Sequence, residues 1–253
     1  MAKKTTKERY TILIQGPLNN NSLDNVESYK SFGRVCVSFW SDMVDPNWES
    51  LEVAEAYLDS LQVEYTSECM PNIQRIIGAS KESTFYFALK SMFNGLRNIN
   101  TDFVIKTRSD ESYKNLKPFL EEFEKNENKI VCGNIFVRNE IPFHFGDHIF
   151  ICKTSDLFGA VKHLLDMYDG IEPIQNYSKQ EEGIPAERIL CTAILNQKNV
   201  NFNLKSDREI FKDNISIIDI NRTEEFIAKW QHTNTTYNEN FINPYRIRVN
   251  DDY

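Results

Sequence analysis

Two cations and two carboxylates surround the end of one very apolar segment, residues 103–107. Lys106 lies inside that segment, and Arg108, Asp110 and Glu111 follow it. Carboxylates at such a place can hold Mg²⁺ or Mn²⁺ together with substrate phosphates. Cations there can offset the charge of a leaving diphosphate. The pattern predicts a phosphate-binding site with Asp110 and Glu111 as candidate metal ligands, and a solvated loop with internal salt bridges is the alternative.

A second group of candidate phosphate contacts lies earlier in the chain. Gln15, Gly16 and Pro17 end a compact apolar run, and a glycine there lets backbone amides approach a nucleotide closely. The sequence has no GxGxxG or Walker pattern at this point, so a simple turn is the competing interpretation. Asn72 and Arg75 lie in a polar segment, and an arginine there could reach a phosphate. We expect these five residues on the donor side of a nucleotide site.

A third candidate packs two histidines and an aspartate into five residues: His144, Asp147 and His148. Zinc accepts such ligands, but no second Cys/His cluster supplies a fourth, which disfavours zinc. Phe143 and Phe145 could stack on a sugar face, and the polar side chains could hydrogen-bond its hydroxyls. We therefore expect an acceptor-sugar site with His144 and His148 as binding residues. A plain turn before a strand is the alternative.

Glu187 is the fourth candidate. Pro185 suits the first turn of a helix, so Glu187 falls where the helix macrodipole favours a carboxylate. That explains the residue structurally. The functional alternative is a general base, and Asp147 is its rival for that role.

Hydrophobic periodicity predicts the elements that must position these residues. Strands are predicted at residues 10–15, 35–40, 103–107, 129–137 and 148–152, and helices from Pro46 to about 61, after Ser80, near 157–170 and at 186–196. Asn19, Asn20 and Asn21 are expected to continue the loop after the first strand. The order of elements predicts an α/β fold with a mixed, mostly parallel central sheet flanked by helices. Ligands of such sheets bind at the carboxyl ends of strands, where the candidates fall.

The bulk properties limit the class of protein. A chain of 253 residues suits a flexible tail at 1–9 and a single domain at 10–253, with its nucleotide-binding part at about 10–112 and its acceptor side at about 113–253. The net charge of −8 disfavours nucleic acid as a partner. Five cysteines without a CxxC pattern predict reduced thiols. No run approaches the roughly 20 apolar residues of a membrane helix. We expect a cytoplasmic protein without a transmembrane segment, and peripheral membrane contact stays open.

Taken in order, these segments resemble the WavE family of lipopolysaccharide-synthesis proteins, which are assigned to glycosyltransferases with a GT-A-like, Rossmann-like fold. The matching pieces run from about Ile12 to Leu195 and read ILIQGPL, VSFW, PNIQR, FVIKTRSDE, FHFGDHIFIC and PAERIL. The resemblance implies a nucleotide-sugar donor above the first strand. It also implies that RSD takes the place of the DxD motif, with Asp110 as a contact to a divalent cation (Mn or Mg) or to the diphosphate. Arg108 stands where the first aspartate would be, so Arg108 and Lys106 could neutralise the diphosphate themselves.

The sequence therefore predicts a glycosyltransferase. It would move a sugar from a nucleoside-diphosphate sugar to a glycan or lipopolysaccharide-type acceptor hydroxyl, with inversion favoured. Two alternatives stay open. One is a metal-dependent phosphoryl or nucleotidyl transferase that uses the same charged cluster. The other is a non-catalytic glycan-binding module, which would bind glycans without any affinity for nucleotides.

Overall fold

The structure is a computed structural model that describes residues 6–18, 20–42, 50–70, 81–135, 137–138, 141–170 and 185–227. Two predicted donor-site residues, Asn72 and Arg75, lie outside these ranges, as does the predicted helix start at Pro46.

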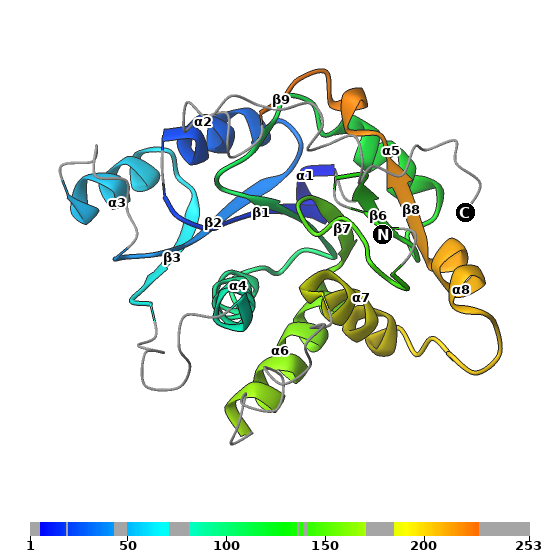
Figure 1. Ribbon diagram of the computed structural model, residues 1–253. Helices are drawn as coiled ribbons and strands as arrows, with labels where there is room; N and C mark the ends of the chain where they lie inside the picture. Colours follow the sequence, from blue (N-terminus) through cyan, green and yellow to red (C-terminus); the bar gives the residue numbers. More distant parts are fainter. Residues whose placement is uncertain are drawn as a thin grey trace, which may run out of the picture.

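Helices and strands alternate through the first half of the chain (Figure 1). The strands are β1 (Tyr10–Gln15), β2 (Arg34–Trp40), β3 (Glu64–Glu68), β4 (Phe103–Arg108), β5 (Ser112–Tyr113), β6 (Ile130–Gly133), β7 (Phe150–Lys153), β8 (Ile215–Ile218) and β9 (Phe226–Ile227). The helices are α1 (Thr6–Arg9), α2 (Asn20–Tyr29), α3 (Leu51–Ser60), α4 (Lys81–Leu96), α5 (Lys117–Lys125), α6 (Thr154–Gly170), α7 (Ala186–Gln197), α8 (Asp207–Asn214) and the 3-10 helix η3 (Ile220–Thr223).

Seven strands form one mixed sheet in the order β3-β2-β1-β4-β7-β6-β8, and β5 pairs with β9 separately. The pairs β2–β3, β1–β2, β1–β4 and β6–β8 are parallel. Strand β7 is antiparallel to both neighbours, β4 and β6. Its amino end therefore lies beside the carboxyl ends of β4 and β6, and the segment before Phe150 reaches the same edge of the sheet as the residues that follow Arg108. The predicted α/β class with a mixed, mostly parallel sheet is confirmed.

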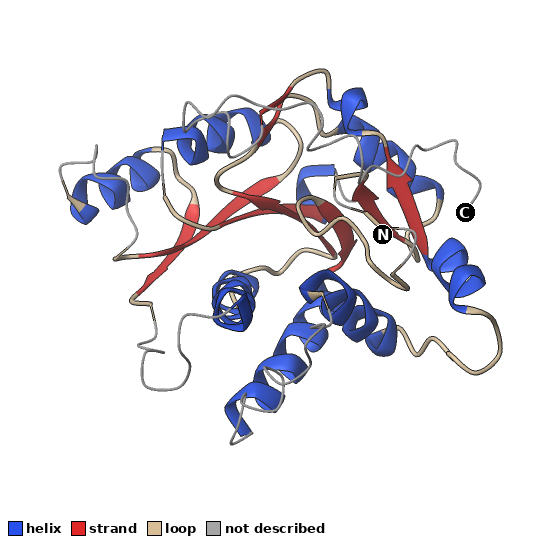
Figure 2. Cartoon of the chain, in the orientation of Figure 1, coloured by secondary structure: helices blue, strands red, loops and turns tan. Residues whose placement is uncertain are grey.

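Helices cover both faces of the sheet (Figure 2). Helices α4, α6 and α7 enclose one apolar layer, and α2, α3 and α5 enclose the other. Strand β1 shows why: Leu13 packs into the first layer, whereas Ile12 and Ile14 pack into the second. Strands buried on both faces read as continuous apolar runs, which is why these strands were predictable from the sequence.

Two local predictions need correction. Asn20 and Asn21 begin helix α2 rather than continuing a loop, because Val26 and Tyr29 of that helix are buried against the sheet. Of the segment 1–9, the structure describes the helical turn α1, where the Arg9 guanidinium lies 4.9 Å from the centre of the Phe103 ring. The flexible tail stays a prediction. The strand expected at 129–137 ends at Gly133, since the Asn134 side chain turns to accept a hydrogen bond from the Ile220 amide, 3.0 Å away.

Two bulk expectations can be compared with the structure. All five cysteines are free thiols, and only Cys69 among them is exposed. Across the described ranges, no helix combines the length and the apolar character needed to cross a bilayer.

Candidate active site

The carboxyl ends of β1 and β4 meet at the centre of the sheet. Gln15 lies opposite Arg108 in the parallel register, and the Ser109 amide donates to the Gln15 carbonyl at 2.9 Å. The Gln15 side chain donates to the Ala88 carbonyl of α4 at 2.6 Å. Gly16 has a φ of +134°, and a Cβ there would lie 2.4 Å from Ser109 Oγ. The glycine thus permits the close approach of the two chain segments, with Pro17 partly exposed just beyond it.

Gly16→Ala is expected to destabilise the protein, because the new side chain meets both an unfavourable φ and the Ser109 hydroxyl. The strained backbone alone costs about 1–3 kcal/mol, which lowers the Tm of a domain this size by several degrees. Thermal unfolding of Gly16→Ala and of the double variant Gly16→Ala/Ser109→Ala separates the two causes, since only the clash is relieved in the second. An unchanged Tm in Gly16→Ala would contradict the described geometry.

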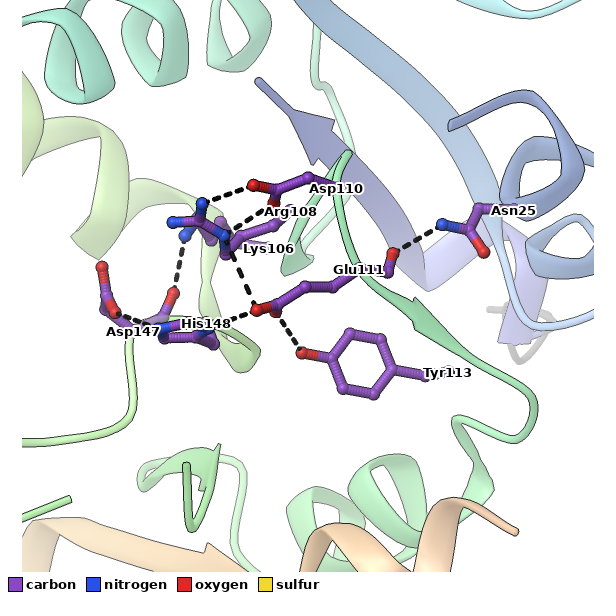
Figure 3. Close-up of polar contacts among 8 residues, drawn as sticks. All are labelled: Asn25, Lys106, Arg108, Asp110, Glu111, Tyr113, Asp147 and His148. Atoms are coloured by element: carbon purple, nitrogen blue, oxygen red, sulfur yellow. Dashed lines mark hydrogen bonds and ion pairs between the residues drawn. The ribbon is translucent and has the colours of Figure 1, made fainter. Parts of the chain in front are cut away.

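Arg108 forms a bidentate ion pair with Asp110 (Figure 3). Its Nε donates to Oδ1 at 2.8 Å and its Nη2 donates to Oδ2 at 2.7 Å, so both carboxylate oxygens of Asp110 are engaged. The Arg108 side chain is 29% exposed. Arg108 therefore offers a partly exposed positive charge at the end of β4.

Glu111 is fully buried beside that ion pair. Its carboxylate accepts hydrogen bonds from His148 Nδ1 at 2.6 Å and from the Tyr113 hydroxyl at 2.9 Å, and Arg108 Nε lies 3.8 Å away (Figure 3). Burial alone would raise the pKa of Glu111, but its electrostatic interaction and hydrogen bond with His148 and the positive charge of Arg108 outweigh that effect and hold this pKa below its usual value. Glu111 is thus an ionised, enclosed carboxylate.

The segment before β7 is fixed tightly. The Lys106 ammonium is buried and donates to the Asp147 backbone carbonyl at 2.6 Å. A Cβ on Gly146 would lie 2.1 Å from the Gly133 carbonyl oxygen, so only glycine fits at this position. Phe143 and Phe145 are 5% and 0% exposed. They belong to the core and cannot stack on a sugar, which corrects that expectation.

Two partly exposed carboxylates, Asp147 and Glu187, lie next to these groups, and their surroundings shift the two pKa values in opposite directions. The side chains of Asp147 and Glu187 are each 27% exposed. Burial would raise the pKa of Asp147, but Lys106 and His148 outweigh it and lower that pKa. Burial, followed by the charge of Asp147, raises the pKa of Glu187. His144 Nε2 lies 3.6 Å from a Glu187 oxygen. Pairs of carboxylates with separated pKa values are typical of acid–base sites.

Asp110 and Glu111, the candidate metal ligands, do not fit a divalent cation as they lie. A cation would have to displace Arg108 from both oxygens of Asp110, or enter the closed surroundings of Glu111. Within the part of the chain that the structure describes, no three His, Cys, Asp or Glu side chains form a cluster that could hold a metal ion. The metal contact therefore stays a sequence prediction that these side chains do not support.

The structure brings the described candidates from all four segments to one edge of the sheet. Lys106 and Arg108 meet Asp147 and His148 because β7 lies beside β4. Glu187 joins them from the first turn of α7, through His144 and Asp147. His144 and His148 are 2% and 6% exposed, so they lie behind the two carboxylates.

Three residues at the site were not anticipated from the sequence: Tyr113, Asn25 and Tyr29. Tyr113 bonds the Glu111 carboxylate, Asn25 donates to the Glu111 carbonyl at 2.6 Å, and Tyr29 Oη accepts from the Tyr113 amide at 3.0 Å. Only the proximity of Tyr113 to Glu111 in the sequence could have indicated this arrangement. The two residues of α2 carry no local signal.

Comparisons with known proteins give structural similarities only. No protein-family profile matches the sequence, and no curated protein matches it either. Among solved structures, S. aureus TarS has a TM-score of 0.46 and 11% identity, covering 83% of this chain and 35% of TarS. The glycosyltransferase GlyE of Streptococcus pneumoniae has a TM-score of 0.44 and 12% identity, covering 84% of this chain and 45% of GlyE. The inositol-1-phosphate CTP transferase of T. maritima has a TM-score of 0.41 and 11% identity, covering 86% of this chain and 87% of that enzyme.

These similarities have clear limits. The chain spans less than half the length of TarS and of GlyE. The similar structures include a glycosyltransferase and a CTP transferase, and TM-scores below 0.5 assign neither a family nor an activity. The resemblance to the WavE family stays a prediction.

Proposed function

We propose that this protein is a glycosyltransferase that moves a sugar from a nucleoside-diphosphate sugar to an acceptor hydroxyl. The observation that supports the proposal best is the arrangement at the carboxyl ends of β1 and β4. The partly exposed Arg108 guanidinium lies beside Gly16, where the two chain segments approach closely. Near it are two carboxylates, Asp147 with a lowered pKa and Glu187 with a raised pKa. The guanidinium and the glycine suit phosphate recognition, and the carboxylates suit deprotonation of a hydroxyl.

Arg108 is the proposed contact of the donor diphosphate. A guanidinium can pair with two phosphate oxygens at once, and its charge stabilises the negative charge that develops on the leaving group. Its surroundings keep the group charged, because Asp110 and Glu111 raise its pKa beyond the cost of burial. Gln15, Gly16 and Pro17 line the neighbouring strand end. In this proposal Lys106 acts mainly on the protein, since its ammonium holds the Asp147 backbone.

Glu187 is the proposed general base. Its raised pKa makes it the stronger base of the two carboxylates, whereas the cations around Asp147 keep that group ionised and weakly basic. Glu187 takes the proton of the acceptor hydroxyl. The hydroxyl oxygen forms a bond to the anomeric carbon, and the bond from that carbon to the diphosphate oxygen breaks with its electron pair leaving on the diphosphate. Such a reaction inverts the anomeric centre, and Asp147 orients the acceptor.

The resemblance to the WavE family supports a lipopolysaccharide-type glycan as the acceptor. We also propose the cytoplasm as the place of reaction. The main alternative, nucleotidyl transfer, would use the same phosphate contacts but would not need a base for a sugar hydroxyl. A non-catalytic glycan-binding module would need neither.

Donor binding is tested by thermal unfolding with added nucleotides. A nucleoside diphosphate at 100 times its Kd should stabilise the protein by about 2.7 kcal/mol, seen as a higher Tm. The shift should persist in EDTA, because Arg108 rather than a cation meets the phosphates. The matching nucleoside without phosphates is the control and should shift the Tm far less. If no nucleoside diphosphate raises the Tm at millimolar concentration, the donor site is wrong.

A further inference from the structure

Glu111 is a carboxylate that the proposed reaction does not use directly. Its side chain is 0% exposed, so no substrate reaches it. Yet it is bonded to His148, which precedes β7, and lies near Arg108 at the end of β4, with Tyr113 of β5 as its third partner (Figure 3). A buried carboxylate with partners on separate elements fixes the positions of those partners, because leaving any of them unpaired is costly.

The backbone around Glu111 is also held. Asn25 of α2 donates to the Glu111 carbonyl at 2.6 Å, and Tyr29 of the same helix accepts from the Tyr113 amide at 3.0 Å. Both α2 residues are buried, at 3% and 0% exposure. These two hydrogen bonds therefore fix the backbone that carries the Glu111 carboxylate to helix α2.

The bond from His148 defines the state of its imidazole. A carboxylate only accepts hydrogen bonds, so His148 Nδ1 must carry a proton. The other ring nitrogen, Nε2, then faces Asp147, whose Oδ1 lies 4.0 Å away. The second partner, Arg108, is the proposed diphosphate contact, and its Nε lies 3.8 Å from the Glu111 carboxylate.

We infer that Glu111 is a positioning residue for the transfer reaction. On the acceptor side, the Glu111 carboxylate sets the tautomer and orientation of His148, which lies beside Asp147. On the donor side, the same carboxylate sets the position of the Arg108 guanidinium. The inference rests on the proposed function for its catalytic consequence. The geometric part, the proton on His148 Nδ1, can be tested without any substrate.

The experiment combines imidazole NMR with turnover. In the wild-type protein, ¹⁵N-labelled on histidine, His148 should show a protonated Nδ1 with a low-field proton resonance, as a short charge-assisted bond produces. The chain has four histidines, and loss of the signal in His148→Gln assigns it. Glu111→Gln should remove the low-field resonance and lower kcat by ~10–100-fold, by analogy with the loss seen when the carboxylate partner of a metal-bound histidine is removed.

Tyr113→Phe is the matched control. It removes a 2.9 Å hydrogen bond from the same carboxylate but keeps the ring that stacks on Phe226, with ring centres 5.1 Å apart. It should keep the low-field resonance, and kcat should fall much less than in Glu111→Gln. Equal losses of kcat in the two variants, at equal losses of Tm, would mean that Glu111 is merely structural and would overturn the inference.

Two further outcomes separate the inference from the proposed function. A wild-type spectrum in which His148 Nδ1 carries no proton overturns the inference, even if Glu111→Gln fails to fold. Full turnover in Glu111→Gln does the same. A wild-type protein that shows the resonance but converts no nucleotide-sugar overturns the proposed function, while the Glu111–His148 pairing is supported.

Discussion

Replacing Glu187 by glutamine is expected to lower turnover by ~10²–10⁴-fold, the contribution of a well-placed general base. Donor affinity should stay nearly unchanged, because the base touches the acceptor and not the nucleotide. Stability should change little, since the helix macrodipole contributes only about 0.3–1 kcal/mol at this position. Steady-state kinetics, donor titration and thermal unfolding of the same preparation check all three.

The pH dependence gives a second readout of the same group. A base must be deprotonated to act, so turnover should rise with pH through the pKa of Glu187. Because burial and the charge of Asp147 raise that pKa, the rise should lie above the pH of about 4.3 at which a free glutamate titrates. The Glu187→Gln variant should lose this limb of the profile.

Two variants control for this assignment. Glu52→Gln makes the same change in the first turn of another helix, α3, and should leave turnover intact. Asp147→Asn should impair acceptor use less than Glu187→Gln. If Glu187→Gln turns over normally while Asp147→Asn is inactive with unchanged donor affinity, the two roles are reversed.

Arg108→Gln should lower kcat/KM by ~10²–10³-fold, a loss of about 2.7–4 kcal/mol of transition-state stabilisation, as for other groups that stabilise a developing negative charge. The KM for the donor should rise as well, because the charge of Asp110 would then face the diphosphate without its partner. Kinetics at several donor concentrations separate the two effects.

Arg108→Lys is the informative companion variant. Lysine keeps the charge but loses the bidentate geometry, so Arg108→Lys should keep more activity than Arg108→Gln but less than the wild-type protein. Arg34→Gln changes an exposed arginine at the first residue of β2, at the opposite edge of the sheet, and should have no effect. Wild-type kinetics in Arg108→Gln would exclude this residue from the donor site.

The fold class was predictable because the central strands are continuous apolar runs and the longest helices carry strong periodicity, whereas strands β3, β5, β8 and β9 and helix α5 were not predicted. Continuous apolar runs indicated β1, β2 and β4, and the apolar stripe after Ser80 indicated α4. Helix α8 was not predicted although it carries a readable signal, the capping box of Ser206 and Glu209. Helix α2 gave almost no such signal, since three asparagines precede the buried Val26 and Tyr29.

The site was predictable in its location but not in its pairing. The rule that ligands bind at the carboxyl ends of strands placed the charged cluster correctly on one edge of the sheet. The contact of His148 with Glu111 joins residues 37 apart, and it depends on the reversed direction of β7. No local pattern encodes such a contact. The same holds for the burial of Phe143 and Phe145, which the sequence alone presents as exposed aromatic residues.

The central claim is that a glycosyl group, and not a nucleotidyl or phosphoryl group, is transferred. The direct test is ³¹P NMR of the wild-type protein incubated with a panel of nucleoside-diphosphate sugars and lipopolysaccharide-type glycan acceptors, with Glu187→Gln as the control for adventitious activity. The predicted result is a free nucleoside diphosphate that appears in step with a glycosylated acceptor, in the wild-type protein only. Release of a nucleoside monophosphate with the sugar phosphate retained in the acceptor, or release of a sugar 1-phosphate with the nucleotidyl group retained in the acceptor, would contradict this claim and indicate phosphosugar or nucleotidyl transfer.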